Sequence, residues 1–144
     1  MLARIAMGLP DMERRMGKPP GQMSGLVLAY VGDTLYDLYV RTMLIESTDL
    51  TARGLHAKAI SYVCAAAQAR AFSRVEPMLT QEELAIYKRG RNAHINTAAK
   101  NASIADYRSA TGFEALVGFL YLSGMDGRLN EIMGAALCGA GIRD

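Results

Sequence analysis

The chain has 144 residues, enough for one domain, and 51% of them are hydrophobic against 21% charged, which excludes a disordered or fibrous protein. Its longest apolar runs, 26–31 and 115–122, are too short to span a bilayer, and its start lacks a signal-peptide block, so we expect a cytoplasmic protein without membrane contact. The net charge is only +2. Residues 53–108, however, hold nine basic and four acidic side chains, and an acidic segment lies on either side of them. This basic stretch either faces a polyanion or is a chance distribution of surface charges.

The first 21 residues are predicted to form a flexible N-terminal arm, because glycine and proline recur there without a helical or strand period. The remaining folded domain is predicted to span 22–140. From Ser24 to Glu46 the chain is densely apolar, and Gly32 is its only interior breaker. This pattern predicts a long buried helix, because strands would need turn residues at shorter intervals.

Two further helices are predicted in the middle of the chain. The alanine-rich stretch 55–73 should form one continuous helix, which Pro77 closes. Thr80 and Glu83 have the spacing of a capping box, in which each side chain bonds the backbone of the other. That spacing predicts a helix that starts after Thr80 and continues to about Arg89.

The last third of the chain begins with a polar connection at 90–106, of a length that is usually functional inside a compact domain. A helix is predicted over 107–123, with Gly124 where a C′ glycine belongs. Asp126 is expected to cap a last helix that ends near Leu137. No segment alternates as a strand does, so the sequence predicts an all-α fold with about five main helices.

Cysteine and histidine are too scarce in this chain for several kinds of disulfide or metal site. Two cysteines, Cys64 and Cys138, cannot form a disulfide framework or a four-ligand zinc site, and we expect both to be small reduced core residues. The two histidines are too few for a histidine-based metal site, and His94 is expected to be a surface residue.

Two carboxylates stand out because their helices are apolar nearly all round. Asp33 and Glu114 are flanked by aliphatic and aromatic residues, where an ionised carboxylate is costly unless it is paired or binds a metal. Asp37 has an i,i+4 partner in Arg41 and is expected to be a surface ion pair. Asp33 and Glu114 have no such local cation, so they either hold Mg²⁺ together or accept hydrogen bonds from distant groups.

These two positions resemble the signature motifs of ribonuclease III, E-x-x-G-D and D-x-x-E-A-L-x-G. Asp33 and Glu114 match one acid of each motif. Ala29 and Thr111 stand where that family has its other glutamate and aspartate. The chain therefore departs from the full four-acid pattern.

A closer resemblance is to Mini-ribonuclease III, the short relatives that lack a double-stranded-RNA-binding domain. The shared elements are L-A-Y-x-G-D ending at Asp33, R-G-R-N-A at 89–93, K-N at 100–101, and Y-R followed by F-E-A-L around Glu114. They occur in the same order over about residues 22–138. The resemblance implies a homodimeric, all-α ribonuclease III catalytic domain.

The same resemblance implies the activity and its cofactor. It implies a Mg²⁺-dependent endoribonuclease that cuts double-stranded RNA, leaves 5′-phosphate and 3′-hydroxyl ends, and matures large-subunit (23S) ribosomal RNA. Asp33 and Glu114 would be its catalytic and metal-binding residues, with more water on the metal because two family acids are absent. A ribosomal protein or the pre-ribosome is a further candidate partner.

Four basic residues are the candidates for binding the RNA backbone. Duplex RNA is recognised mainly through phosphates and 2′-hydroxyls, which suits positive side chains at a helix end and in a polar loop. These candidates are Lys88, Arg89, Arg91 and Lys100. For each of them a solvated surface position is the competing interpretation, as it is for Arg70 and Arg74.

A second class of function stays open at this point. A ribonuclease-III-like domain can be a non-catalytic RNA-binding or ribosome-assembly module, and the loss of two family acids is what such a module would show. Retention of both Asp33 and Glu114 favours the enzyme, because acids in apolar settings are costly to keep without a role.

Overall fold

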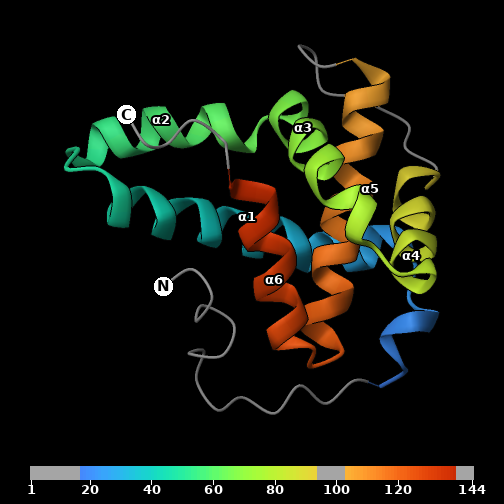
Figure 1. The fold of residues 1–144 in the computed structure, drawn as a ribbon. Helices are drawn as coiled ribbons and strands as arrows, with labels where there is room; N and C mark the ends of the chain where they lie inside the picture. Colours follow the sequence, from blue (N-terminus) through green and yellow to red (C-terminus); the bar gives the residue numbers. More distant parts are fainter. Residues whose placement is uncertain (1–16, 94–102, 139–144) are drawn as a thin grey trace.

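The computed structural model of the chain describes residues 17–93 and 103–138 (Figure 1). Within these ranges it contains six α-helices, two short 3-10 helices and no strand. The elements are η2 (Pro20–Gln22), α1 (Gly25–Ser47), α2 (Ala52–Val63), α3 (Ala65–Val75), η3 (Glu76–Met78), α4 (Gln81–Arg91), α5 (Ile104–Leu122) and α6 (Asp126–Leu137). The predicted all-α fold is confirmed.

Helix α5 forms the centre of the domain, and α1, α3, α4 and α6 all pack against it (Figure 1). Every residue from Ala110 to Tyr121 is buried except Glu114, which is half-buried. A helix that is apolar all round is stable only when neighbours cover it on all sides. The position of Glu114 in this helix therefore places a carboxylate close to the middle of the fold.

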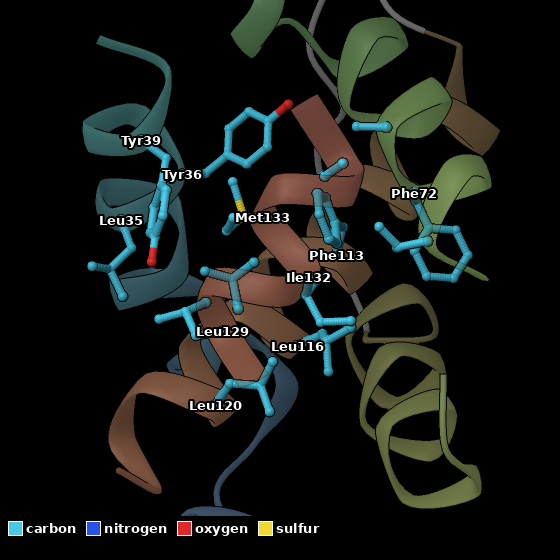
Figure 2. Packing of buried hydrophobic residues seen from close by; sticks show 14 of the residues in the cluster. Leu35, Tyr36, Tyr39, Phe72, Phe113, Leu116, Leu120, Leu129, Ile132 and Met133 are labelled. Atoms are coloured by element: carbon cyan, nitrogen blue, oxygen red, sulfur yellow. The ribbon is translucent and has the colours of Figure 1, made fainter. Parts of the chain in front are cut away.

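The core between α1, α5 and α6 consists of aromatic and aliphatic side chains that interdigitate (Figure 2). The rings of Tyr36 and Phe113 meet edge to face, with centroids 5.6 Å apart. Leu129, Ile132 and Met133 reach this core from α6 and are fully buried. Their burial joins the last helix to the first, although the two are far apart in the sequence.

Glycines allow α1 and α5 to touch along their backbones. A methyl group at Gly32 would lie 1.8 Å from the carbonyl oxygen of Glu114, and one at Gly118 would lie 1.9 Å from that of Leu28. Such distances are far inside van der Waals contact, so no larger residue fits at either crossing point. The two glycines thus set the closest approach of the helices that carry Asp33 and Glu114.

The glycine of the R-G-R-N-A element has a similar packing role. A methyl group at Gly90 would lie 2.6 Å from the Ala115 side chain, and one at Gly25 would lie 2.7 Å from Gly90 itself. Helices α1, α4 and α5 therefore meet at this point. This motif in α4 therefore contributes to helix packing, in addition to any contact that it makes with a substrate.

Local signals predicted most helix ends correctly. Helix α1 begins at Gly25, one residue after the start of the predicted stretch, and Thr80 and Glu83 form the predicted capping box of α4. Helix α6 ends at Leu137 as expected. Gly124 has a φ of 71°, the left-handed conformation that glycine adopts without strain.

Several expectations about local structure were wrong. The stretch 55–73 is two helices, α2 and α3, separated at Cys64, whose ψ of 158° is extended. The described chain therefore has six α-helices instead of about five, and α5 begins at Ile104 rather than near 107. Asp126 is the first residue of α6 and not its cap, which is Met125.

Both cysteines were also misplaced by the sequence prediction. Cys64 and Cys138 are free but exposed, because each lies just beyond the end of a helix rather than on a packed face.

Among the described residues, no helix is both long enough and apolar enough to cross a membrane.

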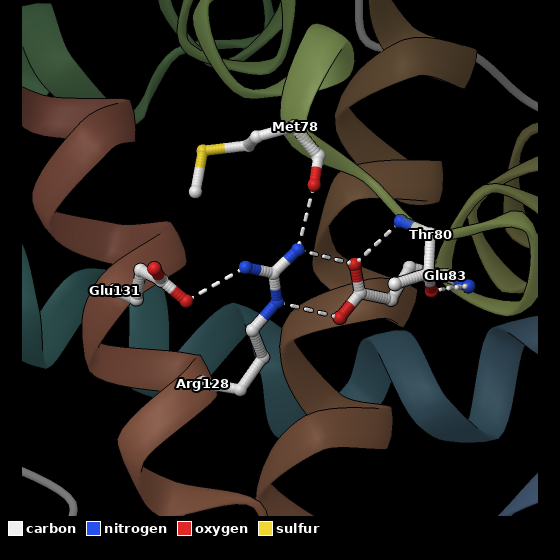
Figure 3. Close-up of polar contacts among 5 residues, drawn as sticks. All are labelled: Met78, Thr80, Glu83, Arg128 and Glu131. Carbon is white, nitrogen blue, oxygen red and sulfur yellow. Dashed lines mark hydrogen bonds and ion pairs between the residues drawn. The ribbon is translucent and has the colours of Figure 1, made fainter.

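One buried ion pair connects α6 to the start of α4 (Figure 3). The Arg128 guanidinium donates to both carboxylate oxygens of Glu83 at 2.8 Å and to the Met78 carbonyl at 2.7 Å. Glu83 also accepts from the Thr80 backbone at 2.9 Å, so its carboxylate is well satisfied although the residue is 3% exposed. The hydrogen bond from Arg128 holds the pKa of Glu83 below its ordinary value.

Replacing Glu83 by glutamine is expected to destabilise the fold by about 2–3 kcal/mol at neutral pH, because a buried charge-assisted pair loses one charge. Since its pKa is lowered in the folded state, the stabilisation is present above the ordinary pKa of 4.5 and is lost as the pH falls below it. Urea unfolding measures both effects.

Glu131→Gln is the matched control, because Glu131 binds the same arginine but its side chain is 60% exposed. Its effect should be within about 0.5 kcal/mol. Equal losses in the two variants would contradict a special role for the buried pair.

Candidate active site

Asp33 on α1 and Glu114 on α5 line one cavity of about 280 Å³. The packing of α1 against α5 through Gly32 places the two carboxylates side by side. The cavity is completed by residues of α2, α3 and α5, namely Val63, Ala65, Gln68, Tyr107, Ala110 and Thr111. The structure thus brings together the two acids that the sequence singled out from separate helices.

The surroundings of the two acids are unequal. Asp33 is exposed, which corrects the expectation that both carboxylates would be buried. Both acids line the cavity, but Glu114 is half-buried in the central helix. Burial, followed by the nearby Asp33 carboxylate, raises the pKa of Glu114 to about 8.

The raised pKa of Glu114 predicts how metal-free stability depends on pH. Because the folded state keeps a proton that the unfolded chain releases near pH 4.5, stability should fall as the pH rises from about 4.5 to about 8. Glu114→Gln removes this titration, so it should stabilise the protein by a few kcal/mol at about pH 8 and have little effect at about pH 4. Urea unfolding in the presence of a chelator measures the difference.

A difference between Glu114→Gln and the unchanged protein that does not vary with pH would contradict this prediction. A divalent cation should also reduce the stability advantage of Glu114→Gln, since a cation between the carboxylates favours their ionised forms.

Two side chains bond the carbonyls at the end of α2, beside the cavity. The Tyr36 hydroxyl donates to the Tyr62 carbonyl at 3.2 Å, and Gln68 Nε2 donates to the Val63 carbonyl at 2.9 Å. Both carbonyls lie at the C-terminal end of α2, which stops where the chain becomes extended at Cys64. Gln68 Nε2 also donates to Glu114 Oε2 at 3.2 Å.

Gln68 was not identified from the sequence, where it is one polar residue in an alanine-rich helix. Its pairing with Glu114, a residue 46 positions further along the chain, exists only after the chain has folded. No local signal predicts this contact.

The two positions that lack the family acids differ in their location. Ala29 is buried on α1 and does not line the cavity. Thr111 does line it, but its hydroxyl donates to the Tyr107 carbonyl one turn earlier at 3.1 Å. The cavity therefore offers two carboxylates, with a hydroxyl beside them.

This set of donors fits a hydrated Mg²⁺ better than a fully protein-bound ion. The described residues contain no group of three or more histidine, cysteine, aspartate or glutamate side chains that could hold a metal. Mg²⁺ is commonly held by one or two carboxylates and keeps several waters. Asp33 and Glu114 supply the carboxylates, and the cavity has room for the waters.

The basic candidates occupy different environments. Lys88 is exposed on α4, whereas Arg89 donates from Nη1 to the carbonyls of Gly21 and Met23 at 2.7 and 2.9 Å. Arg91 lies over the Tyr87 ring, 5.7 Å from its centroid. The two arginines thus have structural contacts in addition to any contact with RNA.

The remaining basic candidates are placed as follows. Lys100 and His94 lie outside the described residues. Arg70 is exposed on α3, and Arg74 donates from Nε and Nη2 to the Ala136 carbonyl near the end of α6. Arg74 therefore has a structural role in joining α3 to α6.

The outer face of α1 carries several exposed apolar side chains beside one ion pair. Tyr30 is 84% exposed, and Leu26, Val27, Leu38 and Ile45 on the same helix are exposed as well. Asp37 and Arg41 form the expected i,i+4 ion pair, at 2.9 Å. Large apolar side chains gathered on one helix face are typical of a protein interface.

Comparisons with known proteins define the class to which this fold and site belong. Residues 26–125 match the ribonuclease III domain, a domain of endoribonucleases. The chain is 50% identical over 113 residues to Mini-ribonuclease 3 of Clostridium tetani, which covers 78% of this chain and 75% of the relative. It is 46% identical to Mini-ribonuclease 3 of Enterococcus faecalis, over 78% of this chain and 86% of the relative.

A solved structure agrees with the fold. The crystal structure of a protein from Fusobacterium nucleatum superposes with a TM-score of 0.75 and 26% identity, covering 83% of this chain and 95% of that chain. The chain belongs to the Mini-ribonuclease III family, and it is an endoribonuclease of the ribonuclease III type.

Proposed function

We propose that the chain is a Mg²⁺-dependent endoribonuclease that cuts double-stranded RNA during maturation of 23S ribosomal RNA in the cytoplasm. The observation that supports this proposal best is the meeting of Asp33 and Glu114 in one cavity, where burial and the nearby Asp33 carboxylate make it costly to ionise Glu114. A cation removes that cost. The ribonuclease name of the relatives favours this function over a non-catalytic RNA-binding module.

Both acids would take part in binding the cation. The exposed Asp33 and the half-buried Glu114 of the central helix would hold the cation by their carboxylates. When bound, Mg²⁺ supplies an acidified water and positive charge against the scissile phosphate. Hydrolysis then leaves a 5′-phosphate and a 3′-hydroxyl.

The exposed face of α1 supports a two-fold homodimer. Its apolar side chains would pair with the same face of a second copy, and each protomer would cut one strand of the duplex. We expect the interface to bury roughly 1,200 Å² or more in total. Sedimentation of the purified protein at micromolar concentration should show a dimer, and a monomer alone would contradict it.

The duplex would be bound by Lys88, Arg89, Arg91 and Lys100. Lys88 is free to approach phosphates on the surface of α4. Arg89 also bonds the carbonyls of Gly21 and Met23, and Arg91 lies over the Tyr87 ring of its own helix, so their replacement by alanine would weaken folding contacts as well as RNA binding. A ribosomal protein or the pre-ribosome is the proposed context of the substrate.

A cleavage assay tests the proposed function directly. The protein should cut a duplex that spans a 23S ribosomal RNA precursor end in Mg²⁺, and leave it intact in a chelator. End analysis should find 5′-phosphates on the products. Tight duplex binding in Mg²⁺ without any cleavage would instead support the non-catalytic module.

A further inference from the structure

Gln68 is a polar residue in a buried position beside the two acids. Its side chain extends from α3 to the cavity that holds Asp33 and Glu114, and the residue is only 4% exposed. Nε2 donates to two acceptors, Glu114 Oε2 at 3.2 Å and the Val63 carbonyl at 2.9 Å. One amide group therefore connects the end of α2 to a candidate metal-binding carboxylate.

The Val63 carbonyl fixes the orientation of this amide. A carbonyl oxygen can only accept, so the nitrogen and not the oxygen of Gln68 must face it. Among the described residues, the buried Oε1 has no hydrogen-bond partner. The side chain thus leaves its oxygen unpaired in order to keep both donor contacts.

We propose that Gln68 is a positioning residue, which holds the Glu114 carboxylate in place beside Asp33 before a cation binds. This inference rests on the proposed cation site. Partners that orient metal-binding groups commonly change metal affinity by 10- to 100-fold when removed. Gln68 acts here through Glu114 and need not touch the cation.

Tyr36 provides the matched control for this role. Its hydroxyl bonds the Tyr62 carbonyl, the neighbour of Val63 at the same interruption between α2 and α3. Tyr36→Phe therefore loosens the interruption but leaves the bond from Gln68 to Glu114 intact. Gln68→Met removes both donor contacts at similar side-chain volume.

Mn²⁺ binding to the RNA-free protein, followed by the electron paramagnetic resonance of free Mn²⁺, tests the proposal. We expect Gln68→Met to weaken binding roughly tenfold and Tyr36→Phe to change it by less than about twofold. In cleavage assays Gln68→Met should raise the half-saturating Mg²⁺ concentration. Its kcat at saturating Mg²⁺ and its KM for RNA should stay within a few-fold of the unchanged protein.

Two results would overturn the role of Gln68 alone: unchanged Mn²⁺ affinity in Gln68→Met, or an equal loss in Tyr36→Phe. Absence of Mn²⁺ binding by the unchanged protein would overturn the cation site itself and Gln68 with it. If Gln68→Met does not fold, the side-chain amide resonances of the unchanged protein decide. Addition of Mg²⁺ should shift that of Gln68 and not those of the exposed Gln22 and Gln81, and an unmoved Gln68 resonance would overturn the proposal.

Discussion

Replacing Asp33 by asparagine, or Glu114 by glutamine, is expected to reduce cleavage of duplex RNA roughly 10³-fold or more. Each change keeps the shape of the side chain and removes one of the two charges that would hold Mg²⁺ in the cavity. Binding of the duplex should persist, because phosphate contacts by basic side chains provide most of the affinity. Cleavage in Mg²⁺ and binding in Ca²⁺, measured on the same substrate, separate the two effects.

Asp37→Asn is the matched control for these variants. Asp37 lies on the same helix one turn beyond Asp33, and its carboxylate pairs with Arg41 on the surface. Its loss should cost little, as is usual for exposed ion pairs, and cleavage should be unaffected. If the Asp33 and Glu114 variants cut as fast as the unchanged protein, both acids are structural and the site assignment is wrong.

Gly32→Ala is expected to destabilise the protein by about 3 kcal/mol or more and to abolish cleavage in whatever protein still folds. The new methyl group would lie 1.8 Å from the Glu114 carbonyl oxygen, an atom of a central helix that cannot move without repacking the core. Overpacking of this kind costs most when the obstacle is backbone. Separation of α1 from α5 would also move Asp33 away from Glu114.

Gly134→Ala is the control, because a methyl group at Gly134 of α6 would have no neighbour within 4 Å. It should stabilise the fold by about 0.5–1 kcal/mol, since alanine is the better helix residue. Urea unfolding of both variants gives the comparison. A Gly32→Ala protein as stable as the unchanged one would show that α1 and α5 do not approach as closely as the structure has them.

The sequence predicted the fold class and most helix ends because the responsible interactions are local. The capping box of Thr80 and Glu83 and the left-handed Gly124 act over one helical turn, so a short window of residues contains the whole signal. The apolar surroundings of Asp33 and Glu114 likewise identified the two acids that now meet in one cavity. Their catalytic and metal-binding roles stay predictions.

Only the tertiary structure decided how the site is built around these acids. The interruption at Cys64 lies in an alanine-rich stretch without glycine or proline, where Tyr36 of α1 bonds the Tyr62 carbonyl and Gln68 of α3 reaches Glu114 on α5. The exposure of Asp33 and the contacts of Arg89 with the Gly21 and Met23 carbonyls depend in the same way on distant segments. Local propensity contains no information about such partners, because they become neighbours only when the helices pack.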